Sequence, residues 1–162
     1  RPPVPHASMA HAGFWLAALE TDAEVIVRLT SDCPLLAPEV AEEALVMFRA
    51  QHADYLGTTR PTLAVPDGLD VEIFTRAALK TAHREATGED REHVTSFLWR
   101  HPERFKIGCL AALAHPDHLA WKLSVEDQAD LDRVRAIHAR IPAGDFSMAA
   151  TLKAAHEVVA DG

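Results

Sequence analysis

Residues 24–40 read EVIVRLTSDCPLLAPEV, and this stretch decides the fold class. Its run from Val25 to Leu29 is short, apolar and β-branched, which is typical of a strand covered on both faces, as in a parallel sheet. Asp32 follows just past the carboxyl end of that strand. In open α/β sheets ligands bind outside these ends, so the carboxylate is well placed to bind a metal ion or a substrate hydroxyl. The alternative is that Asp32 only caps a turn.

The rest of the chain alternates helical and strand patterns, which predicts one layered α/β domain. Residues 1–12 contain neither a signal peptide's apolar core nor a transit-peptide pattern, and we expect them to form a leading loop. Helices are expected over residues 14–19, 38–50, 76–86, 90–100, 126–141 and 148–159, with Thr75 and Asp90 as N-caps. Strands are expected over residues 54–57, 69–74, 107–113 and 119–125.

Length and charge narrow the class of protein. The 162 residues suffice for one domain, which at this size buries roughly 70% of its unfolded surface. A formal charge of −8 argues against partners such as nucleic acids or anionic membranes, which bind a concentrated basic face. No apolar run approaches the ~20 residues that span a bilayer. Cys33 and Cys109 show neither metal-site spacing nor a disulfide framework. We therefore expect a soluble, cytoplasmic protein.

Acidic residues stand at or near the ends of several predicted strands. Asp70 and Glu72 share one face of their strand, opposite Val71 and Ile73, because side chains alternate along a strand. This polar face either lines a sugar pocket or meets water. One or two carboxylates suffice for Mg²⁺ when substrate phosphates complete its shell. The acids that could face one cleft are Asp32, Asp67, Asp70, Glu72 and Glu126; the alternative is a set of unrelated surface acids.

The segment around residues 90–95 offers a second group of candidates. Arg91 and Thr95 are four residues apart on one expected helix face, with Glu92 and His93 beside them. A helix N-terminus attracts anions, so Arg91 is placed to bind a carboxylate or phosphate, although neighbouring acids already complement the dipole. His93 is equally well explained as an ordinary polar residue. The ten histidines form no zinc motif, and no Gly-x-Ser-x-Gly or Walker-type loop is present.

Four segments, taken in order and spacing, carry a resemblance to a known family. They are VRLTSDCPLLAPEV (27–40), VPDGLDVEIF (65–74), DREHVTSFLWRHPERF (90–105) and WKLSVEDQADLDRVR (121–135). Together they resemble the cytidylyltransferase-like proteins of spore-coat polysaccharide biosynthesis, which are related to acylneuraminate cytidylyltransferases. The similarity extends over about residues 14–141.

The resemblance implies a three-layer α/β/α, Rossmann-like fold of the nucleotide-diphosphosugar transferase type. It also implies transfer of CMP from CTP, or from another NTP, to a sugar or sugar acid with Mg²⁺ as cofactor, and a possible homodimer. Asp32 would be the catalytic residue and a metal ligand, with Glu126 or Asp127 as the second ligand. The substrate-binding residues implied are Arg28, Ser31, Asp67, Gly68, Asp70, Glu72, Arg91, Glu92, His93 and Thr95.

Two departures from the family pattern affect the expected function. The family's opening strand and glycine/arginine loop, which cradles the triphosphate, has no counterpart here. We therefore expect that half of the nucleotide site lies outside these residues and that the chain alone does not turn over. Glu126 stands where the family usually has Asp, which moves the carboxylate outward by about 1.5 Å, and Ser31 replaces a Gly.

Two alternatives to a part of a cytidylyltransferase-like enzyme stay open. They are a non-catalytic sugar-phosphate binding or dimerisation module and an unrelated α/β domain.

Overall fold

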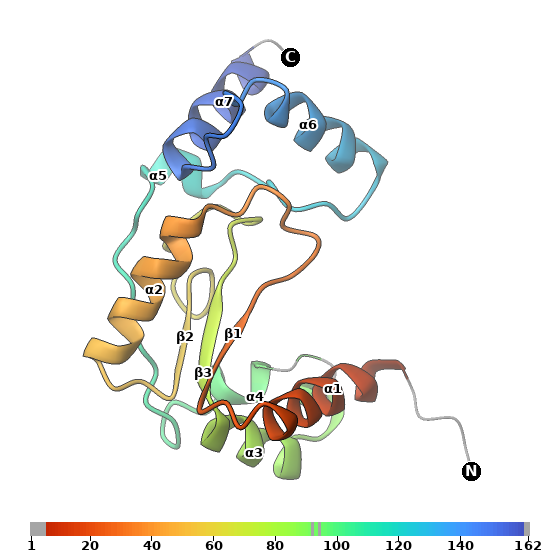
Figure 1. Ribbon diagram of the computed structural model, residues 1–162, viewed down its shortest axis with the longest axis vertical. Helices are drawn as coiled ribbons and strands as arrows, with labels where there is room; N and C mark the ends of the chain where they lie inside the picture. The colour runs from red at the N-terminus through yellow and green to blue at the C-terminus, as the bar shows by residue number, and fades with distance from the viewer. Residues whose placement is uncertain (1–5, 92, 94, 161–162) are drawn as a thin grey trace.

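Three short strands form the sheet in the computed structural model, which describes residues 6–91, 93 and 95–160. They are β1 (Val25–Arg28), β2 (Tyr55–Gly57) and β3 (Glu72–Thr75), and their order in the sheet is β1-β3-β2 (Figure 1). Both pairings are antiparallel, and Glu72 lies opposite Arg28 on one side and Gly57 on the other. The predicted mixture of helices and strands is therefore confirmed, with β3 at the centre of the sheet.

β1 corrects the first expectation drawn from the sequence. Within the described part of the chain it pairs with β3 alone and runs antiparallel to it, so the prediction of a parallel strand buried on both faces is wrong. Val25 and Val27 are 36% and 43% exposed. An apolar β-branched run shows that a strand forms, but its position in the sheet depends on β3, which lies more than forty residues further on.

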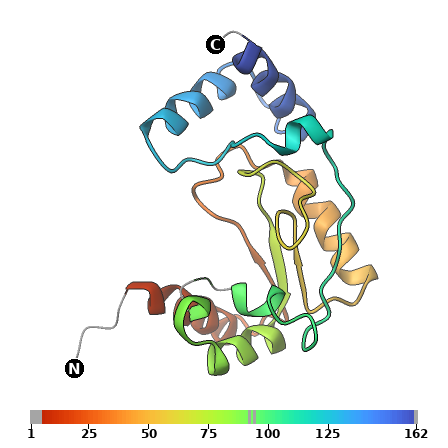
Figure 2. The ribbon, with the colours of Figure 1, turned by 180° about the vertical axis from the view of Figure 1, so that it is seen from behind.

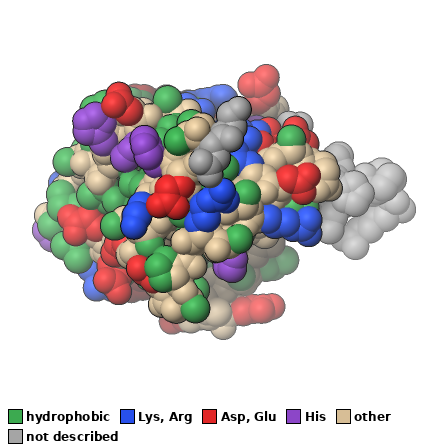
Figure 3. Space-filling view, turned by 90° about the horizontal axis from the view of Figure 1, so that it is seen from above, with side chains coloured by type: hydrophobic (Ala, Val, Ile, Leu, Met, Phe, Trp, Pro, Cys, Tyr) green, Lys and Arg blue, Asp and Glu red, His purple; other side chains and the backbone are tan. Residues whose placement is uncertain are grey.

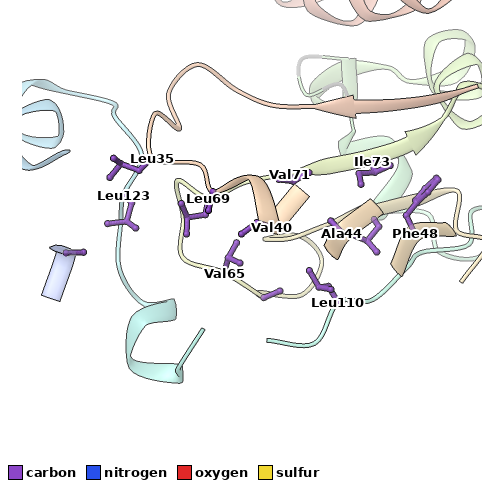
Figure 4. Packing of buried hydrophobic residues seen from close by; sticks show 14 of the residues in the cluster. Leu35, Val40, Ala44, Phe48, Val65, Leu69, Val71, Ile73, Leu110 and Leu123 are labelled. Atoms are coloured by element: carbon purple, nitrogen blue, oxygen red, sulfur yellow. The ribbon is translucent and has the colours of Figure 1, made fainter. Parts of the chain in front are cut away.

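The two faces of β3 contact different hydrophobic clusters, because its side chains alternate as predicted. Val71 and Ile73 are fully buried in a cluster with one face of α2 (Pro38–Ala50), which forms over the residues predicted for it. Figure 4 shows Val71 and Ile73 close to the side chains of this helix. Phe74 belongs to the second cluster, on the opposite side of the sheet.

That second cluster packs the sheet against α1 (His6–Glu20), α3 (Arg76–Glu85) and α4 (Ser96–Trp99), which gather at one end of the molecule (Figures 1 and 2). The side chain of Thr75 accepts a hydrogen bond from the Ala78 amide at 3.0 Å, so its predicted N-cap is confirmed. The leading loop expected over residues 1–12 is wrong from residue 6 onward, because α1 already begins there.

Residues 88–125 contain less regular structure than predicted. The helix expected over residues 90–100 is replaced by a 3-10 turn, η1 (Gly88–Arg91), and by α4, whose N-cap residue is Thr95 rather than Asp90. The strands expected over residues 107–113 and 119–125 do not form. Each segment contributes one isolated parallel bridge instead, Ile107 to Tyr55 and Lys122 to Asp67. These segments lie beside the sheet without extending it.

Three helices lie at the other end of the molecule: α5 (Pro116–Leu119), α6 (Gln128–His138) and α7 (Met148–Ala160). α6 and α7 pack on each other, and buried residues such as Ile137 join them to the hydrophobic cluster that contains one face of α2. Acidic and basic side chains lie interspersed on the face seen in Figure 3. No helix within the described residues combines the length and apolarity needed to cross a membrane.

Candidate functional site

A cavity of about 730 Å³ opens on the face of β3 that carries Glu72, away from α2. Segments that are distant in sequence line it: the loop after β1, the loop after β2, α4, and the residues before α6. Of the predicted site residues, the cavity brings together Arg28, Asp32, Asp67, Asp70, Glu72, His93, Thr95 and Glu126. Ser31, Gly68 and Asp127 are not among its lining residues. The side chain of Arg91 and the whole of Glu92 lie outside what the structure describes.

Glu72 is the most firmly held of these side chains. One of its carboxylate oxygens accepts hydrogen bonds from the Tyr55 hydroxyl at 2.7 Å and from the Thr95 hydroxyl at 2.5 Å. The other oxygen forms an ion pair with Arg28. Burial raises the pKa of Tyr55, and the charge of Glu72 raises it further, so the hydroxyl stays a donor. The Glu72 side chain is only 12% exposed, and its contacts fix it in the cavity wall.

Asp70 fixes the loop that follows β2. Its carboxylate accepts a hydrogen bond from the Gly68 amide at 2.7 Å and another from the Thr59 hydroxyl. The Cys33 thiol lies 3.6 Å from the same carboxylate and 3.7 Å from Asp32. Burial raises the pKa of Cys33 to about 11, so the thiol stays protonated at neutral pH and acts as a weak donor between the two acids.

A close backbone contact joins residues 65–68 to residues 121–125. The Leu123 amide donates to the Asp67 carbonyl at 2.7 Å, and the Ser124 hydroxyl donates to the Asp67 carboxylate at 2.8 Å. Gly68 has a φ of 100°, and a Cβ atom there would lie 2.3 Å from the Leu123 carbonyl carbon. Only glycine allows both this dihedral and this approach. The Pro-Asp-Gly turn thus brings two of the four sequence segments together.

Asp32 lies at the end of the cavity where the loop after β1 meets the residues before α6. Its carbonyl accepts a hydrogen bond from the Val125 amide at 2.8 Å, which places it beside the backbone that leads to Glu126. A hydrogen bond from the Thr30 side chain is the main reason that the pKa of Asp32 is lowered, and it outweighs the opposing effect of burial. The Asp32 carboxylate is therefore ionised at neutral pH.

Glu126 and Asp127 have different roles in the structure. Asp127 is the N-cap of α6, where its side chain accepts from the Asp130 amide at 2.9 Å. Glu126 faces the cavity and accepts from Lys122 at 2.8 Å, while the Glu126 amide donates to the Asp130 carboxylate at 3.0 Å. Asp127 therefore caps the helix and does not line the cavity in this structure. Asp32 and Glu126 are the acids at this end of the cavity.

The two carboxylates at this end of the cavity suit a hard cation whose remaining ligands come from a substrate. The described residues contain no group of three or more histidine, cysteine, aspartate or glutamate side chains arranged to hold a metal ion. Mg²⁺ commonly takes one or two carboxylates and obtains its other oxygen ligands from water and phosphates. Asp32 and Glu126 fit that pattern, and they do not fit a site made of protein ligands alone.

The α4 side of the cavity contains residues that were not among the predicted site residues. The Asp90 carboxylate accepts hydrogen bonds from the Ser96 hydroxyl at 3.0 Å and from Arg100 at 2.8 Å. The Arg100 guanidinium lies over the Trp99 ring, 5.2 Å from its centroid. The presence of Asp90 and Arg100, two opposite charges in the third sequence segment, was the signal that could have indicated this contact. The other lining residues missed by sequence reasoning are Phe14, Thr30, Cys33, Thr59, Arg60, Leu63 and Ser124.

Comparison with solved structures defines the class of fold. A cytidylyltransferase from Leptospira borgpetersenii serovar Hardjo-bovis superimposes with a TM-score of 0.81 over 93% of this chain and 63% of that protein, at 19% sequence identity. The fold is thus the Rossmann-like α/β fold of nucleotidyltransferases, as the resemblance implied. The model of the cytidylyltransferase family matches residues 14–140, and the chain belongs to that family. An unrelated α/β domain is thereby excluded.

Two curated relatives are similar in sequence. An uncharacterised protein of Methanocaldococcus jannaschii is 34% identical over 95 residues, which are 58% of this chain and 37% of that protein. The spore coat polysaccharide biosynthesis protein SpsF of Bacillus subtilis is 27% identical over 116 residues, which are 70% of this chain and 47% of SpsF. The chain thus spans less than half the length of both relatives.

Proposed function

We propose that this cavity takes part in the transfer of CMP from CTP to a sugar or sugar acid, with release of pyrophosphate. The observation that carries the proposal is that the ionised Asp32 and Glu126 line one cavity, where the Asp32 carbonyl binds the amide of Val125 next to Glu126, and that the other acids of this cavity are fixed by hydrogen bonds. Nucleotidyl transfer depends on positioning and charge neutralisation more than on a protein nucleophile. Such an arrangement supports that chemistry, and family membership supports CTP as the nucleotide.

Asp32 and Glu126 would hold Mg²⁺ in this reaction, and the ion would neutralise charge that develops on the phosphates. Lys122 already contacts Glu126, so it would keep that carboxylate in place before substrates arrive. Asp67 and Asp70 are expected to accept hydrogen bonds from sugar hydroxyls, because their carboxylates line the cavity and are held by backbone and hydroxyl donors. A cytoplasmic location and a homodimer stay predictions.

Substitution of Asp32 by Asn tests the proposal. In the protein as its gene encodes it, Asp32→Asn should abolish Mg²⁺-dependent pyrophosphate release from CTP and leave the circular dichroism spectrum unchanged. Asp132→Asn, on the exposed face of α6, is the matched control and should retain activity. Unchanged pyrophosphate release from Asp32→Asn would remove Asp32 from the mechanism.

Magnesium and nucleotide titrations separate the remaining alternatives. Glu126→Gln should raise the Mg²⁺ concentration needed for half-maximal activity, and an unchanged concentration would count against Glu126 as a ligand. Calorimetry of the 162-residue chain with CTP and Mg²⁺ tests the expectation that it lacks the triphosphate cradle. Micromolar binding would contradict that expectation. Binding of a sugar phosphate by the gene-encoded protein, without any binding of CTP, would favour the non-catalytic module.

A further inference from the structure

Among the residues whose side chains the structure describes, three arginines line the cavity, and the partners of their charges differ. Arg28 forms an ion pair with Glu72. Arg100 lies 2.8 Å from Asp90 and 3.9 Å from Glu89. Arg60 also lines the cavity, but the described residues give it no hydrogen bond or ion-pair partner. Of these three described arginines, Arg60 is therefore the one whose charge remains available to a ligand.

The backbone of β2 is shaped to bring Arg60 to this position. Gly57 lies opposite Glu72 in the sheet register, and a Cβ atom at Gly57 would lie 2.4 Å from the Arg60 carbonyl oxygen and 2.4 Å from the Tyr55 hydroxyl. That hydroxyl donates to Glu72, so the missing side chain faces the cavity side of the sheet. A larger residue at Gly57 would have to shift the Arg60 backbone, the Tyr55 side chain or both.

The loop that carries Arg60 is itself held in place. The Ala64 amide donates to the Thr58 carbonyl at 2.7 Å, which closes the loop, and Thr59 is bonded to Asp70. Thr58 is fully buried, and its hydroxyl accepts from the Val71 amide at 2.9 Å. Arg60 thus projects from a loop anchored on both sides, which lowers the entropy cost of binding a ligand.

We propose that Arg60 binds an oxyanion of a substrate, and we assign this oxyanion to the acid group of the acceptor. A planar guanidinium pairs with a carboxylate or phosphate through two parallel hydrogen bonds. The positive charges of Arg28 and Arg100 are paired with carboxylates of the protein, so an incoming anion is attracted mainly by Arg60. This assignment rests on the proposed function in taking the acceptor to be a sugar acid. The nucleotide phosphates are the second source of the same chemistry.

Titrations of the ¹⁵N-labelled protein, followed by two-dimensional NMR, test this assignment. The probes are glucuronate, its neutral counterpart glucose, and tripolyphosphate as a mimic of the nucleotide phosphates. We expect glucuronate to shift the amide signals of residues 58–64 more strongly than glucose does. Arg60→Gln should weaken glucuronate binding by about tenfold or more, the loss expected for one charge-assisted contact. Arg49→Gln removes an exposed arginine that does not line the cavity and should leave binding unchanged.

The outcomes separate the two sources and the two proposals. A loss confined to tripolyphosphate would keep the oxyanion site but overturn its assignment to the acceptor. Equal binding of both anions by wild type and Arg60→Gln, or no binding of either by wild type, would overturn the site itself. Neither result bears on CMP transfer, which Asp32→Asn tests separately. Loss of CMP transfer in turn would leave oxyanion binding measurable by the same titrations.

Discussion

The hydrogen bond from Tyr55 to Glu72 is expected to make a measurable contribution to stability. Tyr55→Phe removes only the hydroxyl, and the ring stays in the second hydrophobic cluster. Tyr55 is fully buried and the Glu72 side chain is 12% exposed, so solvent screens their contact only weakly. The substitution leaves Thr95 on the same carboxylate oxygen and Arg28 on the other, so the charge keeps part of its stabilisation.

Hydrogen bonds to charged groups contribute about 1.5–3 kcal/mol. Because two partners of Glu72 remain, we expect Tyr55→Phe to lower the free energy of unfolding by about 2 kcal/mol, near the lower part of this range. For a protein of this size that loss corresponds to a decrease in Tm of about 4–8 °C.

Urea denaturation followed by tryptophan fluorescence measures this loss, and a double-mutant cycle assigns it. Glu72→Gln in the Tyr55→Phe background should cost less than Glu72→Gln in wild type, with a coupling energy of about 1 kcal/mol or more. A loss below about 0.5 kcal/mol for Tyr55→Phe, or a coupling energy near zero, would refute the reasoning. Either result would mean that Glu72 is held by Arg28 and Thr95 alone.

Three further predictions concern other parts of the site. Gly68→Ala should lower the free energy of unfolding by about 3 kcal/mol or more in urea denaturation, because the strain of a positive φ is added to overlap of the new Cβ atom with the backbone. Gly144→Ala is the control and should lower it by about 1 kcal/mol, because Gly144 also has a positive φ, 83°, but a Cβ atom there would meet no other atom of the described residues within 4 Å. Iodoacetamide at pH 8 should modify exposed Cys109 much faster than buried Cys33, whose pKa is raised to about 11, and equal rates by mass spectrometry would contradict this. The pKa of Asp32 is lowered, chiefly by a threonine hydroxyl, so its stabilising effect is present above the unfolded pKa and is lost as the pH falls through the folded value. Asp32→Asn should therefore flatten the acid side of the stability profile, and an unchanged profile would refute the shift.

Local signals in the sequence predicted the elements whose boundaries depend on local chemistry. α2 begins at Pro38 as expected, because proline at the first helical position costs no hydrogen bond. Thr75 caps α3, because a side-chain oxygen there satisfies a free amide. The alternation of Asp70 and Glu72 with buried neighbours correctly placed both acids on one face, and in the structure that face lines the cavity. Each of these signals acts over a few residues.

Features that depend on distant segments were predicted poorly. β1 has the composition of a central strand, but its position in the sheet depends on its pairing with β3. No local pattern in either segment indicates that these two strands pair. Residues 107–113 and 119–125 are apolar because they pack beside the sheet, and they form only single bridges. The sequence patterns did not identify Arg60 as a cavity residue, because its position depends on the close approach of its backbone to Gly57, which has no side chain. These contacts have no signature within a short window.

The hydrogen bonds of the cavity divide its acids into two groups with different expected roles. The carboxylates of Asp67, Asp70 and Glu72 accept from donors that the fold itself supplies, so their charges are compensated before any ligand binds. Asp32 and Glu126 lie where two loops meet. The ionised Asp32 carboxylate accepts from Thr30, and Glu126 accepts from Lys122, whose side chain is 38% exposed. A cation entering the cavity therefore gains most at this end, because displacing a protein donor from the first group would leave that donor buried and unpaired. The same reasoning places neutral hydroxyls, which can share compensated acceptors, along β3, and it places an anion at Arg60.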